Sequence, residues 1–177
     1  MVHFRNRLYI QNLQPIIGPL DVNWTDWNSS DHYFKGSWIL HTLRNTINND
    51  NLWFDLLKSF YQKHKRSTVK SEDFFNFVNE KTGEDYSSFF TQYLYHANVP
   101  TFEYYVEENE GESYLNYRWQ ADVKEFDMMI EVGPKSNYQR IKPTTDWQKM
   151  IWKDLDKKAF RIRRELFLIK INEVKAP

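Results

Sequence analysis

Tyr33 is the side chain whose position in this sequence suggests chemistry as well as folding. It follows Asp31 by two residues, near the start of a segment, residues 31–47, whose apolar spacing predicts one helix. In the first turn of a helix, a tyrosine can direct its side chain out of the helix end into a cleft. A phenol there is a neutral hydrogen-bond donor, because its usual pKa is near ~10. Half-buried packing is the ordinary role of such a tyrosine, so a chemical role depends on its neighbours.

The histidines do not predict a metal site within this chain. No two of them have i, i+4 spacing, and the H-E-x-x-H arrangement that places two zinc ligands on one helix face does not occur. His, Asp and Glu nowhere cluster as three ligands at short range. His41 is expected to be a hydrogen-bonded core histidine and not a ligand. The full set is His3, His32, His41, His64 and His96.

The composition excludes several classes of function. The 177 residues carry 24 basic and 24 acidic side chains, so nucleic acid is not expected as a partner. There is no cysteine, which excludes disulfides and thiolate chemistry. No stretch predicts a membrane span, and the first ten residues are too charged for a signal peptide. The localisation stays unknown, because cysteine-free chains occur in reducing and oxidising compartments alike.

Helical periodicity recurs from residue 31 to about residue 98. Asp31 is expected to cap the first helix, with the two preceding serines as alternatives. Asn49 marks a break before the next helix, and Gly83 is a typical residue just past a helix end. Short connections predict antiparallel hairpins. The expected helices are residues 31–47, a second from Asp50 to about His64, a third from Ser71 to about residue 82 and a fourth over about residues 86–96.

The apolar period changes from about 3.6 to 2 after Pro100, which is typical of β-strands. Residues 166–171 are apolar enough to predict a central strand. The short strands and tight turns favour an antiparallel sandwich. The other expected strands are residues 102–106, 115–119, 126–132, 138–141 and 147–152.

The sequence therefore predicts an α+β fold in two parts, a helical hairpin bundle followed by an antiparallel β-sandwich. We expect a helical segment over residues 1–98 and a β-sandwich domain over residues 99–177. Residues 1–30 predict no element of their own, because prolines and a glycine interrupt the pattern. Trp24 and Trp27 are expected either to fold onto the following helices or to contact protein that this chain does not contain.

Tyr33 opens a longer ordered pattern. The tetrapeptide Y-F-K-G is followed by S-W-I-L-H-T-L-R, N-N-D-N-L-W-F, K-S-F-Y-Q-K-H and, before the first expected strand, V-P-T-F-E-Y. In this order and spacing the pattern resembles the aminopeptidase N family of gluzincin zinc metallopeptidases, in which a Y-x-K-G-A-like motif opens a helix downstream of the zinc ligands. The resemblance covers about residues 29–105 closely and the sandwich loosely. Ser37 is a mild departure, since alanine is common there.

The resemblance implies a role for Tyr33. In the family, this tyrosine donates a hydrogen bond to the oxyanion that forms when a zinc-activated water attacks the scissile carbonyl. The family's H-E-x-x-H helix and a further glutamate ligand lie upstream of the motif, and this sequence contains neither. The resemblance thus implies that the chain is the C-terminal part of a larger zinc aminopeptidase. Zinc is expected in the parent protein, none is expected to be bound by this chain, and the chain alone is expected to be inactive.

The expected partners follow from the same resemblance. They are the parent's N-terminal metallopeptidase domain and a peptide substrate, and an apolar face exposed by the absence of that domain would allow self-association. The alternative is a non-catalytic binding or scaffold module that kept the shape and lost the chemistry. An upstream reading frame with H-E-x-x-H favours the first hypothesis. An arm over residues 1–30 that folds onto its own helices favours the second.

Overall fold

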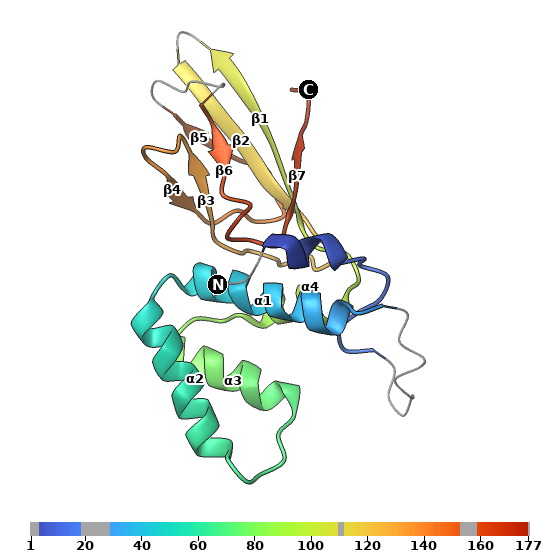
Figure 1. The fold of residues 1–177 in the computed structure, drawn as a ribbon. Coiled ribbons are helices and arrows are strands. Elements are labelled where there is room, and N and C mark those ends of the chain that lie inside the picture. Colours follow the sequence, from blue (N-terminus) through green and yellow to red (C-terminus); the bar gives the residue numbers. More distant parts are fainter. Residues whose placement is uncertain (1–3, 19–28, 110–111, 153–158, 177) are drawn as a thin grey trace.

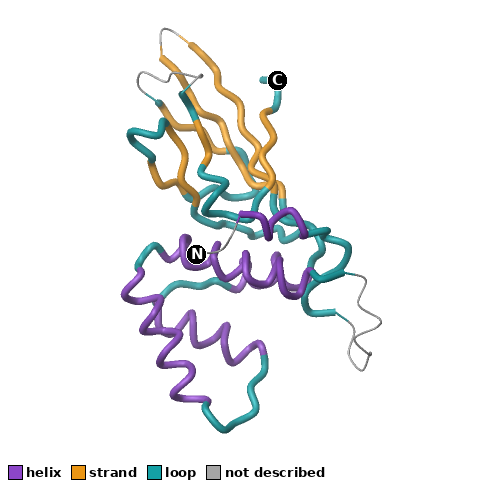
Figure 2. Tube along the Cα trace, viewed as in Figure 1, coloured by secondary structure: helices purple, strands orange, loops and turns teal. Residues whose placement is uncertain are grey.

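The computed structural model describes residues 4–18, 29–109, 112–152 and 159–176, arranged as helices at one end of the molecule and strands at the other (Figures 1 and 2). Trp24 and Trp27 lie outside these residues. No helix in the described ranges is long and apolar enough to cross a membrane. The predicted α+β fold class is confirmed, with helices preceding strands along the chain.

The helices begin and end close to where local sequence signals place them. The Asn49 side chain accepts a hydrogen bond from the backbone N–H of Leu52 at 3.0 Å and so caps the second helix. Gly83 follows the third helix with a φ of 73°, a left-handed conformation that glycine adopts without strain. The helices are η1 (Phe4–Tyr9, a 3₁₀ helix), α1 (Asp31–Ile47), α2 (Asp50–His64), α3 (Ser71–Thr82) and α4 (Ser87–Tyr95).

The prediction that Asp31 caps α1 is wrong, whereas one of the two serines given as alternatives lies at the capping position. Asp31 is the first residue of the helix and not its cap, and the capping position is occupied by Ser30, whose side chain makes no cap hydrogen bond. The Asp31 carboxylate instead accepts a hydrogen bond, 2.8 Å long, from the backbone N–H of Gln11. A residue 20 positions away, which local capping rules do not consider, therefore determines the role of this aspartate.

The strands form two sheets. The larger has the order β5-β2-β1-β7 and the smaller β4-β3-β6, and every pair is antiparallel except β1 with β7, which is parallel. The long hairpin of β1 and β2 dominates the larger sheet (Figure 1). The strands are β1 (Thr101–Asn109), β2 (Glu112–Gln120), β3 (Ile130–Gly133), β4 (Gln139–Ile141), β5 (Gln148–Ile151), β6 (Arg161–Ile162) and β7 (Lys170–Glu173).

The prediction of a central strand over residues 166–171 is wrong. Phe167, Leu168 and Ile169 are buried, but the strand β7 begins only at Lys170 and lies at the edge of the larger sheet. The apolar run marks a segment that packs between the sheets and the helices without joining a ladder. Burial and strand pairing both favour apolar residues, so the sequence pattern could not separate them.

Helices and sheets meet along α1. The Thr42 hydroxyl accepts a hydrogen bond of 2.8 Å from the backbone N–H of Leu168, and the Tyr93 hydroxyl of α4 donates one of 2.8 Å to the Leu168 carbonyl. Arg7 of η1 donates to the carbonyls of Arg164 and Ile169 at 2.6 Å each. The N-terminal 3₁₀ helix, α1 and the strand region are therefore held together directly. Whether residues 1–98 and 99–177 are separate domains stays a prediction.

Candidate functional site

Tyr33 lies in the first turn of α1 with its side chain in solvent. It is 70% exposed, and within the described part of the chain its hydroxyl makes no hydrogen bond. Its backbone N–H donates to the Ser30 carbonyl at 3.0 Å, so the residue is part of the regular helix and not of a frayed end. The ring lies 4.0 Å from that of its neighbour His32, between centroids. Among the described residues, the phenol is thus an unbonded donor on a regular helical turn.

The opposite side of the same turn carries two buried charges. Lys35 has no exposed surface, and its Nζ donates to the Ala97 carbonyl at 2.6 Å and the His96 carbonyl at 3.2 Å. Asp31 is 2% exposed, and its Oδ2 has no hydrogen-bond partner among the described residues. Burial lowers the pKa of Lys35 to about 8, although the negative charges of Asp31 and Asp122 act in the other direction. Neither charge was selected as a site residue from the sequence.

The segment that accepts Lys35 is itself fixed by buried polar contacts. Gln92 of α4 is fully buried, and its Oε1 accepts from the backbone N–H groups of Asp122 and Val123 at 2.8 and 2.9 Å. Its Nε2 donates to the Asn98 carbonyl at 3.1 Å. The His96 ring lies 3.8 Å from the Asp122 carboxylate. The chain leaving α4 is therefore hydrogen-bonded to Gln92 of α4, which also bonds the segment after β2, at the place where it accepts Lys35.

Apolar side chains are exposed on the same helix and next to it. Leu40 lies seven residues after Tyr33, hence on the same side of α1, and is partly exposed. Tyr9 of η1 packs its ring 5.1 Å from that of Phe34 and also remains exposed. Clustered apolar side chains on a surface are typical of contacts with other protein. The other large exposed apolar residues of the helical part are Leu8, Leu13, Phe54, Leu57, Tyr61, Val69 and Tyr95.

The described residues do not fit a zinc ion. No group of three or more His, Asp or Glu side chains among them could hold a metal. His41 is half-buried, with its Nε2 3.3 Å from the Glu165 carbonyl and its ring edge-on to Trp38 at 5.3 Å. Burial lowers the pKa of His41. These contacts agree with the packing role expected for this histidine.

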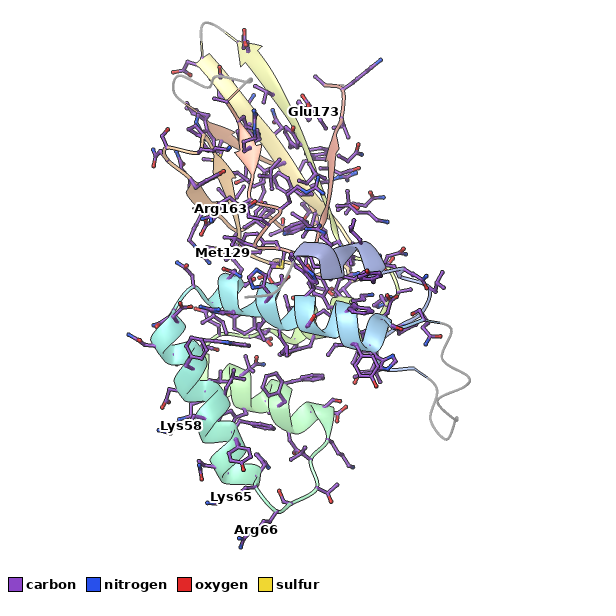
Figure 3. All side chains as sticks on the ribbon, viewed as in Figure 1. Lys58, Lys65, Arg66, Met129, Arg163 and Glu173 are labelled. Atoms are coloured by element: carbon purple, nitrogen blue, oxygen red, sulfur yellow. The ribbon has the colours of Figure 1, made fainter. Side chains whose placement is uncertain are left out.

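A cavity of about 450 Å³ lies at the opposite end of α1, lined by residues that include Thr46, Phe89 and Met129. Met129 is labelled in Figure 3, between the strands and α1. With a rise of ~1.5 Å per residue, thirteen residues of helix separate this cavity from Tyr33 by roughly 20 Å. The cavity is therefore distinct from the surface around Tyr33.

The chain resembles aminopeptidases in sequence and in fold. No family model matches the chain. Over 82 residues, 46% of its length, the chain is 32% identical to an aminopeptidase N of Lactococcus lactis. Its fold matches that of Legionella pneumophila aminopeptidase A, solved in complex with aspartic acid, with a TM-score of 0.65 over 84% of the chain at 12% identity. The chain is aminopeptidase-like. It spans 9% of the length of that aminopeptidase N and 18% of the aminopeptidase A chain.

Lys35 is the main feature that sequence reasoning missed. A signal was present, because Asp31, Lys35 and Ile39 follow one another at i, i+4 spacing on a single side of the helix. All three are buried. Lysine on an apolar stripe usually extends its charge to water, so the pattern alone did not predict complete burial.

Proposed function

We propose that this chain is part of a zinc-dependent gluzincin aminopeptidase that removes N-terminal residues from peptides. Residues 1–98 would complete the catalytic domain, and residues 99–177 would form the β-sandwich domain. Sequence similarity to one aminopeptidase and fold similarity to another support the proposal. The zinc ligands would come from the parent's N-terminal metallopeptidase domain, since the described residues supply no ligand set.

The observation that carries the proposal is the position of Tyr33. Its hydroxyl has no hydrogen-bond partner among the described residues, and it lies in the first turn of a helix whose other side contacts the strand region and the chain leaving α4. In the parent, this phenol would donate a hydrogen bond to the oxyanion formed from the scissile carbonyl. Such a donor acts strongly when it is held in place before the reaction, because no reorganisation is then needed as the charge develops.

An activity assay tests the dependence on the parent. The isolated chain should not hydrolyse aminoacyl-anilide substrates, with or without added zinc, because zinc supplies the nucleophile in this chemistry and the described residues do not fit it. Zinc-dependent turnover by the isolated chain would overturn the proposal. The same assay on a polypeptide that joins this chain to an upstream H-E-x-x-H segment from its own reading frame should show hydrolysis.

A second candidate is a non-catalytic binding or scaffold module derived from the same fold. The packing of residues 4–18 favours it, because η1 and residues 10–18 contact this chain's own helices and strand region. Arg7 donates to the carbonyls of Arg164 and Ile169 and lies 5.2 Å from the Trp38 ring. The Ile17 N–H donates to the Leu94 carbonyl at 2.9 Å. An upstream reading frame without H-E-x-x-H would favour this module over the peptidase.

A further inference from the structure

The first turn of α1 is built around a charged residue that the proposed chemistry does not use. Lys35 follows Tyr33 by two residues, so the two side chains leave the helix about 200° apart. One is 70% exposed and the other has no exposed surface. On the side of the turn away from the phenol, the Lys35 ammonium group therefore bonds the helix to another part of the chain.

We propose that Lys35 is a positioning residue for Tyr33: it fixes the first turn of α1, and with it the phenol, against the chain that leaves α4. This proposal rests on the proposed function in one respect: the reaction in which Tyr33 would take part. The fastening itself is a property of this chain and can be measured without zinc or substrate.

The contacts of Lys35 explain why it can act as a clamp. Its two acceptors, the carbonyls of His96 and Ala97, lie 61 and 62 residues further along the chain, so the bonds join two separate segments. Charged donors form stronger hydrogen bonds than neutral ones. The segment that carries the acceptors is also tied to α4, because Gln92 donates to the Asn98 carbonyl just beyond them.

Asp31 forms a second connection between the first turn of α1 and another segment of the chain. Asp31 is in the same turn as Tyr33, and its Oδ1 accepts from the Gln11 N–H at 2.8 Å, which joins the turn to the segment after η1. Tyr9 packs on Phe34 from the same side. The turn is therefore held by the segment after η1 and by the chain about 60 residues after it, while the Tyr33 side chain on its other side is 70% exposed.

A simple packing role would not require a charge at this position. An apolar side chain would fill the same space without the penalty of burying an ammonium group, which is large unless the charge is paired. The charged groups that face Lys35 are Asp31 on its own helix and Asp122 on the segment after β2, and the His96 ring faces Asp122. Burial lowers the pKa of Lys35 to about 8 although these carboxylates raise it, so the charge can be removed at a pH that a folded protein tolerates.

The test follows ring-¹³C-labelled tyrosine and the Lys35 side chain by NMR, with Tyr33 assigned through Y33F. Between pH 7 and about 9.5, the Tyr33 ring signals and the Lys35 side-chain signals should shift with one common midpoint. In K35M this transition of Tyr33 should vanish, and the backbone order parameter of Tyr33 should fall from the rigid range, ~0.85, to below ~0.6. K58M, which removes an exposed lysine of α2 (Figure 3), should leave both unchanged.

Each outcome decides the proposal. A shared midpoint supports it even if K35M fails to fold, because that measurement needs only the native chain. Tyr33 signals that stay flat while Lys35 titrates, or that titrate equally in K35M, would overturn it. A lack of peptidase activity in the longer polypeptide would disprove the proposed function and leave this result standing.

Discussion

The two ends of α1 are built by different rules. At the C-terminal end, the Arg140 guanidinium donates to the carbonyls of Asn45 and Thr46 at 3.1 and 2.7 Å, and Asn48 closes the helix in a left-handed conformation. A cation bonded to free carbonyls is what the helix dipole favours there. At the N-terminal end, Ser30 makes no side-chain cap hydrogen bond. Two charges are buried there, Asp31 in the first turn, where the dipole favours negative charge, and the cation Lys35 one turn later, which the dipole does not favour.

The difference indicates which end is selected for stability. The Arg140 bonds stabilise the C-terminal end of the helix, whereas the N-terminal end buries an ammonium group and exposes a phenol. Real proteins depart from local rules most often at functional sites, where stability is lost for the sake of geometry. The comparison therefore points to the first turn of α1, and the following predictions test it from the largest expected effect to the smallest.

Replacing the phenol should affect turnover alone. In the polypeptide that carries the zinc ligands, Y33F should lower kcat by about 10²–10³, because one oxyanion donor is lost. In the isolated chain the same change should leave the urea midpoint unaltered, since the hydroxyl makes no hydrogen bond within the described residues. Steady-state kinetics and urea titration measure the two effects. A kcat within threefold of the native value would contradict the proposed role.

Removing the Arg140 hydrogen bonds at the C-terminal end of α1 should affect stability alone. R140M leaves the carbonyls of Asn45 and Thr46 without their donor and removes an ion pair to Glu131, so the free energy of unfolding should fall by about 2 kcal/mol. The control is K142M, which breaks the half-exposed pair with Asp127 and should cost less than about 1 kcal/mol. Equal losses in the two variants would show that the end of α1 is not specially stabilised.

The pH dependence of stability should reveal the buried charge. The pKa of Lys35 is lowered by burial from 10.5 to about 8, so between these values the unfolded chain binds more protons than the folded one. Stability should therefore rise with pH through this window, by on the order of 1 kcal/mol for each pH unit. The measurement is the difference in unfolding free energy between native protein and K35M from pH 8 to about 9.5. A difference that stays constant, or falls, would show that Lys35 is not a strained buried cation.

The smallest effect is expected on the outer side of α1. L40S removes a partly exposed apolar side chain from the stripe that carries Tyr33, and the free energy of unfolding should change by less than about 0.5 kcal/mol. If the exposed face drives self-association, sedimentation should show less dimer in L40S than in the native chain. A stability loss above 1 kcal/mol would mean that this side is part of the core.

Local sequence signals predicted the elements well where the deciding contacts are local. The Asn49 cap, the end of α3 at Gly83 and the alternating strands around Tyr104 and Tyr117 all depend on residues a few positions apart or directly paired in a hairpin. The signals failed where a distant contact decides. Phe167 and its neighbours are buried without strand pairing. The residues that cover them are distant in the sequence, so a local pattern cannot identify them.

The sequence by itself determined the order of helices and strands, the position of Tyr33 in a first helical turn and the resemblance of its surroundings to an aminopeptidase. Only the tertiary structure decided that Asp31 bonds to Gln11, that Lys35 is fully buried and that the phenol is left in solvent. The physical reason is the range of the interactions. Helix periodicity acts over four residues, but the partners of a buried charge are chosen by whichever carbonyls the fold brings near it, here those of His96 and Ala97.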